Sequence, residues 1–269
     1  MKVNGKVVVV TGAGNGMGRE LTLELVRRGA KVAAVDMRAD FLVETKELAT
    51  KLGGTVETFV VDITDAAAVA VLPQKVTDAL GAPDALLNNA GIIQPFVKII
   101  DLEIAAAAKV MAVNFTGPFL MVKAFLPGLL TRPEAHILNV SSMGAYAPVP
   151  GQSVYGASKA AVMLFTEGLY SELMGTNVGV TVVFPGAIAT NIAGNSGIAM
   201  PGGADAAAAS SNIKMTAAPV AAQKMVNAIE ANNPRITVGS DATMLDRITR
   251  INPIFAAKMI AKQMASLLK

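Results

Sequence analysis

Two residues four positions apart, Tyr155 and Lys159, are the first candidates for chemistry in this sequence. They stand at the start of a long helical pattern, and residues at i and i+4 lie on the same face of a helix. A free phenol has a pKa of about 10 and exchanges protons poorly near pH 7, but a fixed cation beside it favours the phenolate and lowers that pKa. We therefore interpret the pair as a proton-transfer device.

A glycine-rich turn near the N-terminus indicates the reaction in which that proton would move. From Thr11 to Gly18 the sequence reads Thr-Gly-Ala-Gly-Asn-Gly-Met-Gly, between a short apolar run and a helical pattern. In such a turn Gly12 and Gly16 let the backbone approach a pyrophosphate, Gly18 lets the helix pack closely on the sheet, and the helix N-terminus attracts negative charge. The alternative is a simple strand-to-helix bend, because a glycine-rich turn alone is weak evidence. Its flanking elements favour a dinucleotide site.

Asp36, which ends the next apolar run, predicts which dinucleotide is bound. A carboxylate at this point accepts hydrogen bonds from the adenosine ribose and repels a 2′-phosphate, so NAD(H) is expected in preference to NADP(H). Arg38 could reach a phosphate, but Asn15 and Met37 add no positive charge near it, so Asp36 is expected to dominate. The alternative interpretation of Asp36 is a solvated carboxylate at a strand end.

The elements that must position these residues alternate along the chain. Short runs rich in β-branched residues, separated by helix-length segments, lie at Lys6–Val10, Lys31–Asp36, Thr55–Asp62, Ala85–Asn88, His136–Val140, Val178–Phe184 and Arg235–Val238. Apolar strands in this alternation indicate a parallel sheet covered on both faces and joined by right-handed crossovers. We predict a single α/β domain over residues 1–269: a Rossmann-type doubly wound parallel sheet of about seven strands, with helices on both faces.

Two segments depart from that alternation. Residues 187–218 are rich in Gly, Ala, Ser, Asn and Met and are too long for an ordinary connection, which predicts a substrate lid. Residues 241–269 are predicted to form a C-terminal helical segment. Within it, residues 253–269 place lysines on one helical stripe and apolar residues on another, which favours a solvated face over a contact with a membrane surface.

Composition excludes several classes of protein. The 269 residues are 52% hydrophobic, enough for one large core, and the 23 basic and 20 acidic residues are scattered, so no nucleic acid is expected as a partner. The absence of cysteine and the single histidine exclude thiolate catalysis and predict no metal site. We find no run of 18 apolar residues and no signal-peptide pattern, so no membrane span and a cytoplasmic location are expected.

Together these motifs resemble the short-chain dehydrogenase/reductase family over nearly the whole chain. The matching elements, in the family's order, are Thr11-Gly-x-x-x-Gly-x-Gly18, Asp62 after the third run, Asn88-Asn-Ala-Gly91 after the fourth, Asn114 in Val113-Asn-Phe-Thr-Gly117, Ser141-Ser142 after the fifth, Tyr155-x-x-x-Lys159, and Pro185-Gly-x-x-x-Thr190 after the sixth. Every catalytic position of the family pattern is present.

The resemblance implies a catalytic set of Asn114, Ser142, Tyr155 and Lys159. Ser142 would hydrogen-bond the substrate oxygen, with Ser141 as its structural neighbour. Tyr155 would exchange the proton while hydride moves between the substrate carbon and nicotinamide C4. Lys159 would lower the pKa of the phenol and hold the nicotinamide ribose, and Asn114 would kink its helix and retain a water for the proton path.

The resemblance also implies contacts along the whole cofactor. Asp62 and Ile63 would lie beside the adenine, the turn after the fourth run along the ribose, and Ile188 and Thr190 at the carboxamide. The complete predicted cofactor set is Gly12, Asn15, Gly16, Met17, Gly18, Asp36, Asp62, Ile63, Asn89, Ala90, Gly91, Tyr155, Lys159, Pro185, Gly186, Ile188 and Thr190. Each of these alone is open to an ordinary structural interpretation as a turn, a strand exit or an interior amide.

We predict an NAD(H)-dependent oxidoreductase acting on a secondary alcohol or ketone. Two alternatives stay open: another reaction on the same scaffold, such as epimerisation or enoyl reduction, and a dinucleotide-sensing module without turnover. Two long apolar helical patterns, Asp101–Leu130 and Ser153–Met174, predict self-association as a dimer or homotetramer. His136 is interpreted as a surface or packing residue, whereas Tyr146 either packs or lines the substrate site.

The segments expected around the substrate are Ile92–Phe96, Met143–Gln152 and the lid from Asn191 to Met215. They are mostly apolar and contain no arginine, although a phosphorylated or carboxylated substrate ordinarily needs a paired cation or a helix terminus. The substrate is therefore expected to be apolar, for example cyclic, lipid-like or steroidal, and enclosed when the lid closes. The alternative is that these apolar residues pack at an interface and leave the site polar.

Overall fold

The computed structural model describes residues 1–147, 149–198 and 215–264. Within them, seven strands form one parallel sheet in the order β3-β2-β1-β4-β5-β6-β9. The strands are β1 (Val7–Thr11), β2 (Lys31–Asp36), β3 (Thr55–Val60), β4 (Ala85–Asn88), β5 (Ala135–Val140), β6 (Val178–Pro185) and β9 (Arg235–Val238). The predicted doubly wound parallel sheet is confirmed.

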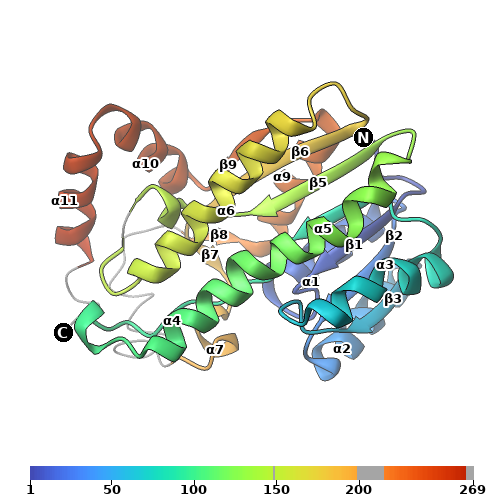
Figure 1. Cartoon of the computed structure of the whole chain (residues 1–269), viewed down its shortest axis with the longest axis horizontal. Coiled ribbons are helices and arrows are strands. Elements are labelled where there is room, and N and C mark those ends of the chain that lie inside the picture. Colours follow the sequence, from blue (N-terminus) through green and yellow to red (C-terminus); the bar gives the residue numbers. More distant parts are fainter. Residues whose placement is uncertain (148, 199–214, 265–269) are drawn as a thin grey trace.

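Helices cover both faces of this sheet (Figure 1). One face carries α1 (Gly16–Arg27), α2 (Ala39–Lys51) and α9 (Ala218–Ala231), and the other carries α3 (Ala66–Leu80), α5 (Gly117–Leu130) and α6 (Ser153–Glu172). Successive strand residues point to opposite faces. In β1, Val8 and Val10 therefore pack in the first layer, whereas Val7 and Val9 pack in the second.

The order of the strands reverses between β1 and β4, which lie side by side in the centre of the sheet. The connections that leave these two strands run in opposite directions, so a crevice opens at their C-terminal ends. Thr11 and Asn88 end the two strands, and the glycine-rich turn and the Asn89–Gly91 turn follow them. The fold therefore brings both predicted cofactor motifs to one edge of the sheet.

A long apolar helix crosses one face of the sheet. It starts as α4 (Ile104–Met111), passes through a π-helical segment η2 (Ala112–Thr116) and continues as α5. By its 27 residues and mean hydropathy of 1.4 it could cross a membrane, but a single helix of this kind is weak evidence, since core helices of soluble proteins have the same properties. The predicted start at Asp101 is wrong, because Ile99–Asp101 forms a separate 3-10 turn, η1.

The C-terminal part adds two helices, α10 (Ser240–Ile251) and α11 (Pro253–Gln263), beside the 3-10 turn η3 (Met143–Ala145) (Figure 1). A small separate core joins Ala147, Leu245 and Ile260. These helices occupy most of the predicted segment 241–269, of which residues 265–269 lie outside the described part.

Most of the predicted lid, residues 199–214, lies outside the described residues. Its described ends contain β7 (Ile188–Ala189), the short helix α7 (Ile192–Asn195) and β8 (Thr216–Ala217). β7 and β8 pair in parallel, so the two ends of the segment lie together. The lid itself stays a prediction.

Candidate active site

The glycine-rich turn connects β1 to α1 and closely approaches the turn after β4. Gly12 has a φ of +66°, and a Cβ atom there would lie 2.9 Å from the Cα of Ala90. A Cβ at Gly18 would collide with the carbonyl oxygen of Gly12, so the helix can start this close to the strand only with glycine. Asn15 caps α1, and its Oδ1 accepts from the N–H of Gly16 at 2.6 Å. This arrangement leaves a helix N-terminus at the turn and suits a pyrophosphate.

Thr11 holds the second turn in place. Its Oγ1 accepts from the backbone N–H groups of Asn89 at 3.0 Å and Ala90 at 3.1 Å, and its carbonyl oxygen accepts from Asn89 Nδ2 at 3.1 Å. Asn89 Oδ1 is buried without a hydrogen-bond partner among the described residues. Because a buried acceptor without a partner is costly, this oxygen fits a site that takes up a polar ligand.

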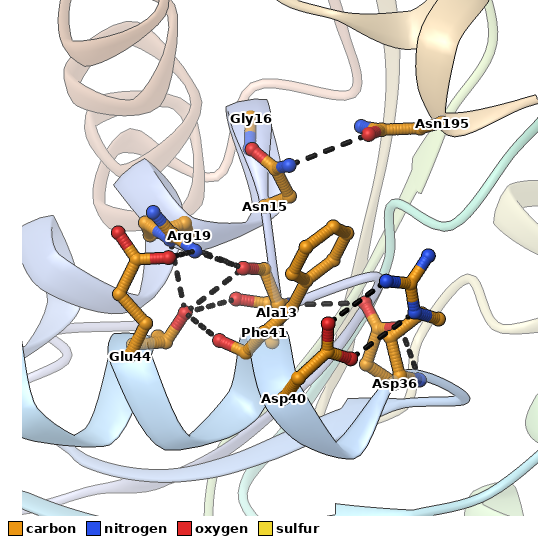
Figure 2. A network of polar contacts seen from close by, with 12 residues as sticks. Ala13, Asn15, Gly16, Arg19, Asp36, Asp40, Phe41, Glu44 and Asn195 are labelled. Carbon is orange, nitrogen blue, oxygen red and sulfur yellow. Dashed lines mark hydrogen bonds and ion pairs between the residues drawn. The ribbon is translucent and has the colours of Figure 1, made fainter.

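Asp36, the residue predicted to bind the adenosine ribose, lies against the glycine-rich turn. Its Oδ2 accepts from the N–H of Gly14 and its Oδ1 from the N–H of Arg38, both at 3.0 Å. Figure 2 shows this carboxylate beside Ala13 and near a second carboxylate, Asp40. The side chain of Asp36 is therefore fixed by two backbone donors at the end of β2 while each oxygen keeps a further lone pair for a ligand hydroxyl.

The two residues predicted beside the adenine differ in their surroundings. Asp62 is exposed, and its Oδ1 accepts from Thr64 N at 2.8 Å and Thr64 Oγ1 at 2.7 Å. β3 accordingly ends at Val60, before the predicted Asp62. Ile63 is buried, and its side chain fills the space beside Gly117 at the start of α5. Its predicted cofactor contact would therefore have to come from its backbone.

Ser142 and Tyr155 meet across Gly144. A Cβ atom at Gly144 would lie 3.4 Å from Tyr155 Cε1 and 3.5 Å from Ser142 Oγ. Burial raises the pKa of the Tyr155 phenol, and its hydrogen bond with Ser142 acts in the opposite direction. Ser142 Oγ also accepts from the N–H of Gly144 at 3.1 Å, which orients the hydroxyl. The serine and the phenol can thus share one substrate oxygen.

Lys159 is buried on the same helix, and its Nζ donates to the carbonyl oxygen of Val140 at 3.0 Å. Burial lowers its pKa to about 8. For the Tyr155 phenol, desolvation is the larger influence on the pKa and raises it, and the predicted lowering of that pKa by Lys159 stays a prediction. Ser141 Oγ donates to the carbonyl oxygen of Lys159 at 2.7 Å, which agrees with its interpretation as a structural neighbour.

Asn114 lies in the π-helical segment η2, where the long helix departs from α geometry. Single π-helical turns inside α-helices occur frequently at functional sites. Its Oδ1 accepts from Ile92 N at 2.8 Å, and its Nδ2 donates to Ile92 O and Ser158 Oγ, both at 2.9 Å. A Cβ at Gly91 would lie 3.1 Å from Lys159 Nζ and 3.3 Å from Asn114 Oδ1. Asn114, Lys159 and the turn after β4 therefore converge.

The loop after β6 reaches both the glycine-rich turn and α10. A Cβ at Gly16 would lie 3.4 Å from the side chain of Thr190, and Asn195 Oδ1 accepts from Asn15 Nδ2 at 3.3 Å. After Pro185, Gly186 N donates to Val238 O at 2.8 Å, which ties the start of the loop to the end of β9. Ile188 lies in β7. The predicted residues of this loop therefore lie at the C-terminal edge of the parallel sheet, near the glycine-rich turn. Met17, by contrast, packs against the core.

Two further residues position the site and were not predicted to do so. Gln94 is buried, and its Oε1 accepts from the N–H groups of Val154 at 2.8 Å and Tyr155 at 3.0 Å. Gln152, the residue before α6, makes no capping hydrogen bond with its side chain, and Gln94 caps the helix instead. Asp241 Oδ2 accepts from Ala187 N at 2.7 Å and ties α10 to the loop after β6. Neither carries a local signal, because both act on backbone distant in sequence.

His136 and Tyr146 have structural roles. His136 is fully buried in β5, with Nε2 2.8 Å from Thr181 Oγ1, so packing is the correct part of its prediction and a surface position is wrong. The ring of Tyr146 packs on Phe184 at a centroid distance of 5.4 Å, and its hydroxyl donates to Ala242 O at 2.9 Å. Of the two interpretations of Tyr146, packing is the one that the structure supports.

Comparison with known proteins agrees with these motifs. Residues 6–200 match the family model described as short chain dehydrogenase. The chain is 34% identical over 267 residues to "Putative oxidoreductase SadH" of Mycobacterium tuberculosis, which covers 97% of this chain and 96% of that protein. It is 39% identical over 197 residues to "Probable oxidoreductase EphD" of the same species, but that match covers 73% of this chain and 33% of EphD. The chain thus corresponds to about a third of that longer relative.

Solved structures have the same fold. A short-chain dehydrogenase/reductase from Burkholderia phymatum in complex with NAD has a TM-score of 0.82 at 26% identity and covers 94% of this chain and 98% of its own. A short-chain dehydrogenase from Burkholderia cenocepacia in complex with NADP has a TM-score of 0.79 at 28% identity and covers 97% and 99%. The fold is that of the short-chain dehydrogenases. This chain belongs to the short-chain dehydrogenase/reductase family.

Proposed function

We propose that this protein transfers hydride between NAD(H) and an apolar secondary alcohol or ketone. The observation that carries the proposal is one continuous set of contacts. Gly12 closely approaches Ala90, and the neighbouring Gly91 lies against Lys159 and Asn114. The phosphate-binding turn and the proton-transfer residues therefore lie on either side of the turn after β4.

The residues present fit a nicotinamide dinucleotide. The glycine-rich turn would hold the pyrophosphate, Asp36 the adenosine ribose, the Asn89–Gly91 turn the next part of the cofactor, and Ile188 and Thr190 the carboxamide. Two features support this fit: the glycine at position 12, and Asn89 Oδ1, which is buried and has no hydrogen-bond partner in the part of the chain that the structure describes. When bound, the nicotinamide would supply or accept the hydride at C4.

The chain's own groups would move the proton. Ser142 would donate a hydrogen bond to the substrate oxygen. Tyr155 would transfer a proton to that oxygen in reduction or remove one from it in oxidation. Burial favours the protonated phenol, which is the state required for ketone reduction. In oxidation the phenolate is needed, and Lys159 is the cation on the same helix face that would favour it.

The preference for NAD over NADP is part of this proposal and is supported by Asp36. A 2′-phosphate placed at the adenosine ribose would meet the carboxylate that Gly14 and Arg38 hold with their backbone N–H groups. Solved relatives include both NAD and NADP complexes, so the family alone does not decide the preference. Titration should show much tighter binding of NADH than of NADPH, and Asp36→Ala should narrow the difference. Equal or tighter binding of NADPH to the wild type would contradict this part of the proposal.

The apolar substrate is supported by the described residues of the predicted substrate segments. Residues 92–96, 143–147, 149–152, 191–198 and 215 contain no charged side chain. The two charges of the lid, Asp205 and Lys214, lie outside the described residues. A cytoplasmic location and a dimer or tetramer complete the proposal.

The test is kcat/KM with NAD(H) across matched pairs of hydrophobic and anionic secondary alcohols and their ketones. The expected result is turnover with consistent preference for the hydrophobic member. A consistent preference for the anionic member would overturn the substrate class, and no turnover of any alcohol or ketone would overturn the reaction.

A further inference from the structure

Two arginines flank the glycine-rich turn, and α2 supplies a carboxylate to each. Asp40 pairs with Arg38 and Glu44 pairs with Arg19. The two acids are four residues apart and lie on the same face of α2. Figure 2 shows Asp40 and Glu44 on the helix beneath the turn, with Asp36 beside Asp40. The cations nearest to the predicted adenosine end are thus both engaged by internal anions.

The two pairs differ in how firmly the arginine is held. Arg19 donates to Gly14 O through Nη2 at 2.6 Å and Nε at 3.1 Å, and to Thr45 Oγ1 at 3.1 Å, in addition to Glu44 Oε2 at 2.7 Å. Its side chain is 14% exposed. Without Glu44, Arg19 would keep the backbone and hydroxyl acceptors that fix it under the turn.

Arg38 depends on Asp40 alone for its side-chain hydrogen bonds among the described residues. Nε donates to Oδ1 at 3.1 Å and Nη2 to Oδ2 at 2.8 Å, a two-bond geometry that also suits a phosphate. The guanidinium lies 4.2 Å from the centroid of the Phe41 ring. Its side chain is 53% exposed, and its backbone N–H contacts the carboxylate of Asp36. Arg38 is therefore a solvent-accessible cation at the ribose-binding carboxylate, with its donors directed to Asp40.

We propose that Asp40 is a second specificity-determining residue at the adenosine end of the cofactor site. Asp36 repels a 2′-phosphate. Asp40 accepts the side-chain hydrogen bonds of Arg38, so this guanidinium is not free to bind a 2′-phosphate. The inference rests on the proposed dinucleotide function and extends it, because the preference for NAD then depends on two carboxylates with different roles. Loss of Asp36 alone removes the repulsion but leaves Arg38 engaged.

The fold should tolerate the test variants. Asp40 and Glu44 have side chains that are 61% and 57% exposed, and exposed ion pairs add little to stability. Glu44→Ala is a matched control, because it removes the same charge from the same helix face while Arg19 stays fixed. A change that follows net charge alone would appear equally in both variants.

The experiment is calorimetric titration with 5′-AMP and 2′,5′-ADP, which differ only in the 2′-phosphate. The quantity to compare is the ratio of the affinity for 2′,5′-ADP to the affinity for 5′-AMP. This ratio should be about tenfold higher in Asp36→Ala/Asp40→Ala than in Asp36→Ala, which is the effect of one charge-assisted hydrogen-bonded contact. Asp36→Ala/Glu44→Ala should not show this gain. Adding Arg38→Ala to the first double variant should abolish it.

An equal gain in both double variants, no gain in either, or a gain that survives Arg38→Ala would overturn the role of Asp40. Failure of the wild type to bind either 5′-AMP or NADH would be a different result, because it would overturn the proposed dinucleotide function, and this inference with it.

Discussion

The stability of this protein should fall on mild acidification because of one buried residue, His136. It is the only histidine, it is fully buried in β5, and burial lowers its pKa from 6.5 to about 3. Thr181 Oγ1 donates to Asn233 O at 2.7 Å, so it accepts from His136 Nε2, which then carries the ring hydrogen. Protonation would add a hydrogen at Nδ1, which is buried without a partner among the described residues. The charged ring is therefore disfavoured in the folded state.

The direction and size of the effect follow from the two pKa values. Between pH 6.5 and about 3 the unfolded state binds more protons at this residue than the folded state, so acid favours unfolding. The contribution of His136 is fully present above pH 6.5 and is lost as the pH falls toward 3. Linkage gives a loss of about 2 kcal/mol in the free energy of unfolding between pH 8 and pH 5.

Urea unfolding followed by circular dichroism at several pH values from 8 to 5, at one protein concentration, measures this loss. His136→Gln is the comparison, because glutamine can hydrogen-bond but does not titrate. Its own cost in stability is the same at every pH and cancels when the pH dependence is compared. The wild type should lose about 2 kcal/mol more than the variant over this range. Parallel pH profiles for the two proteins would refute the reasoning.

Two other predictions concern the site and the surface. Gln94→Leu should lower the free energy of unfolding by about 1–3 kcal/mol, because it leaves two partly buried N–H groups at the start of α6 without their acceptor, and should lower kcat by loosening Tyr155. Thermal unfolding and steady-state kinetics check both effects, and Gln94→Glu, which keeps an acceptor, should recover more activity; equal losses in the two variants would contradict the capping role. Leu164→Glu should abolish self-association without unfolding the chain, since Leu164 is 68% exposed on α6, one of the two helices predicted to pair between subunits. Light scattering measures the mass, and a monomeric wild type at micromolar concentration would contradict the predicted oligomer.

The sheet could be predicted because its strands are encoded locally. Runs of β-branched residues buried on both faces need no knowledge of their partners to be recognised, and their alternation with helices implies parallel pairing. Two boundaries that were wrong, the helix start at Asp101 and the strand end at Asp62, show the limit of this reasoning. β3 ends early because the side chain of Asp62 accepts hydrogen bonds from Thr64. This local bonding competes with strand pairing, and the hydrophobic pattern of the sequence does not reveal it.

The site could be predicted only where the residues form part of a motif. The glycine-rich turn, Ser142, Tyr155 and Lys159 have a recognisable order, and the structure brings them to one edge of the sheet. Gln94 and Asp241 form hydrogen bonds with backbone groups that are distant in sequence, so no local residue spacing predicts their roles. The raised pKa of Tyr155 could not be predicted from residue spacing either, because it depends on burial, which is a property of the assembled fold.

The most direct test of the proposed reaction compares the wild type with Tyr155→Phe in two assays. One is NADH binding by fluorescence titration, and the other is kcat for the best secondary alcohol or ketone. Removal of only the hydroxyl should leave NADH affinity close to that of the wild type while kcat falls by about 10²–10⁴-fold, the usual contribution of a general acid or base. A Tyr155→Phe variant that binds NADH normally and keeps a substantial part of the wild-type kcat would contradict the assigned role of Tyr155 and with it the proposed mechanism.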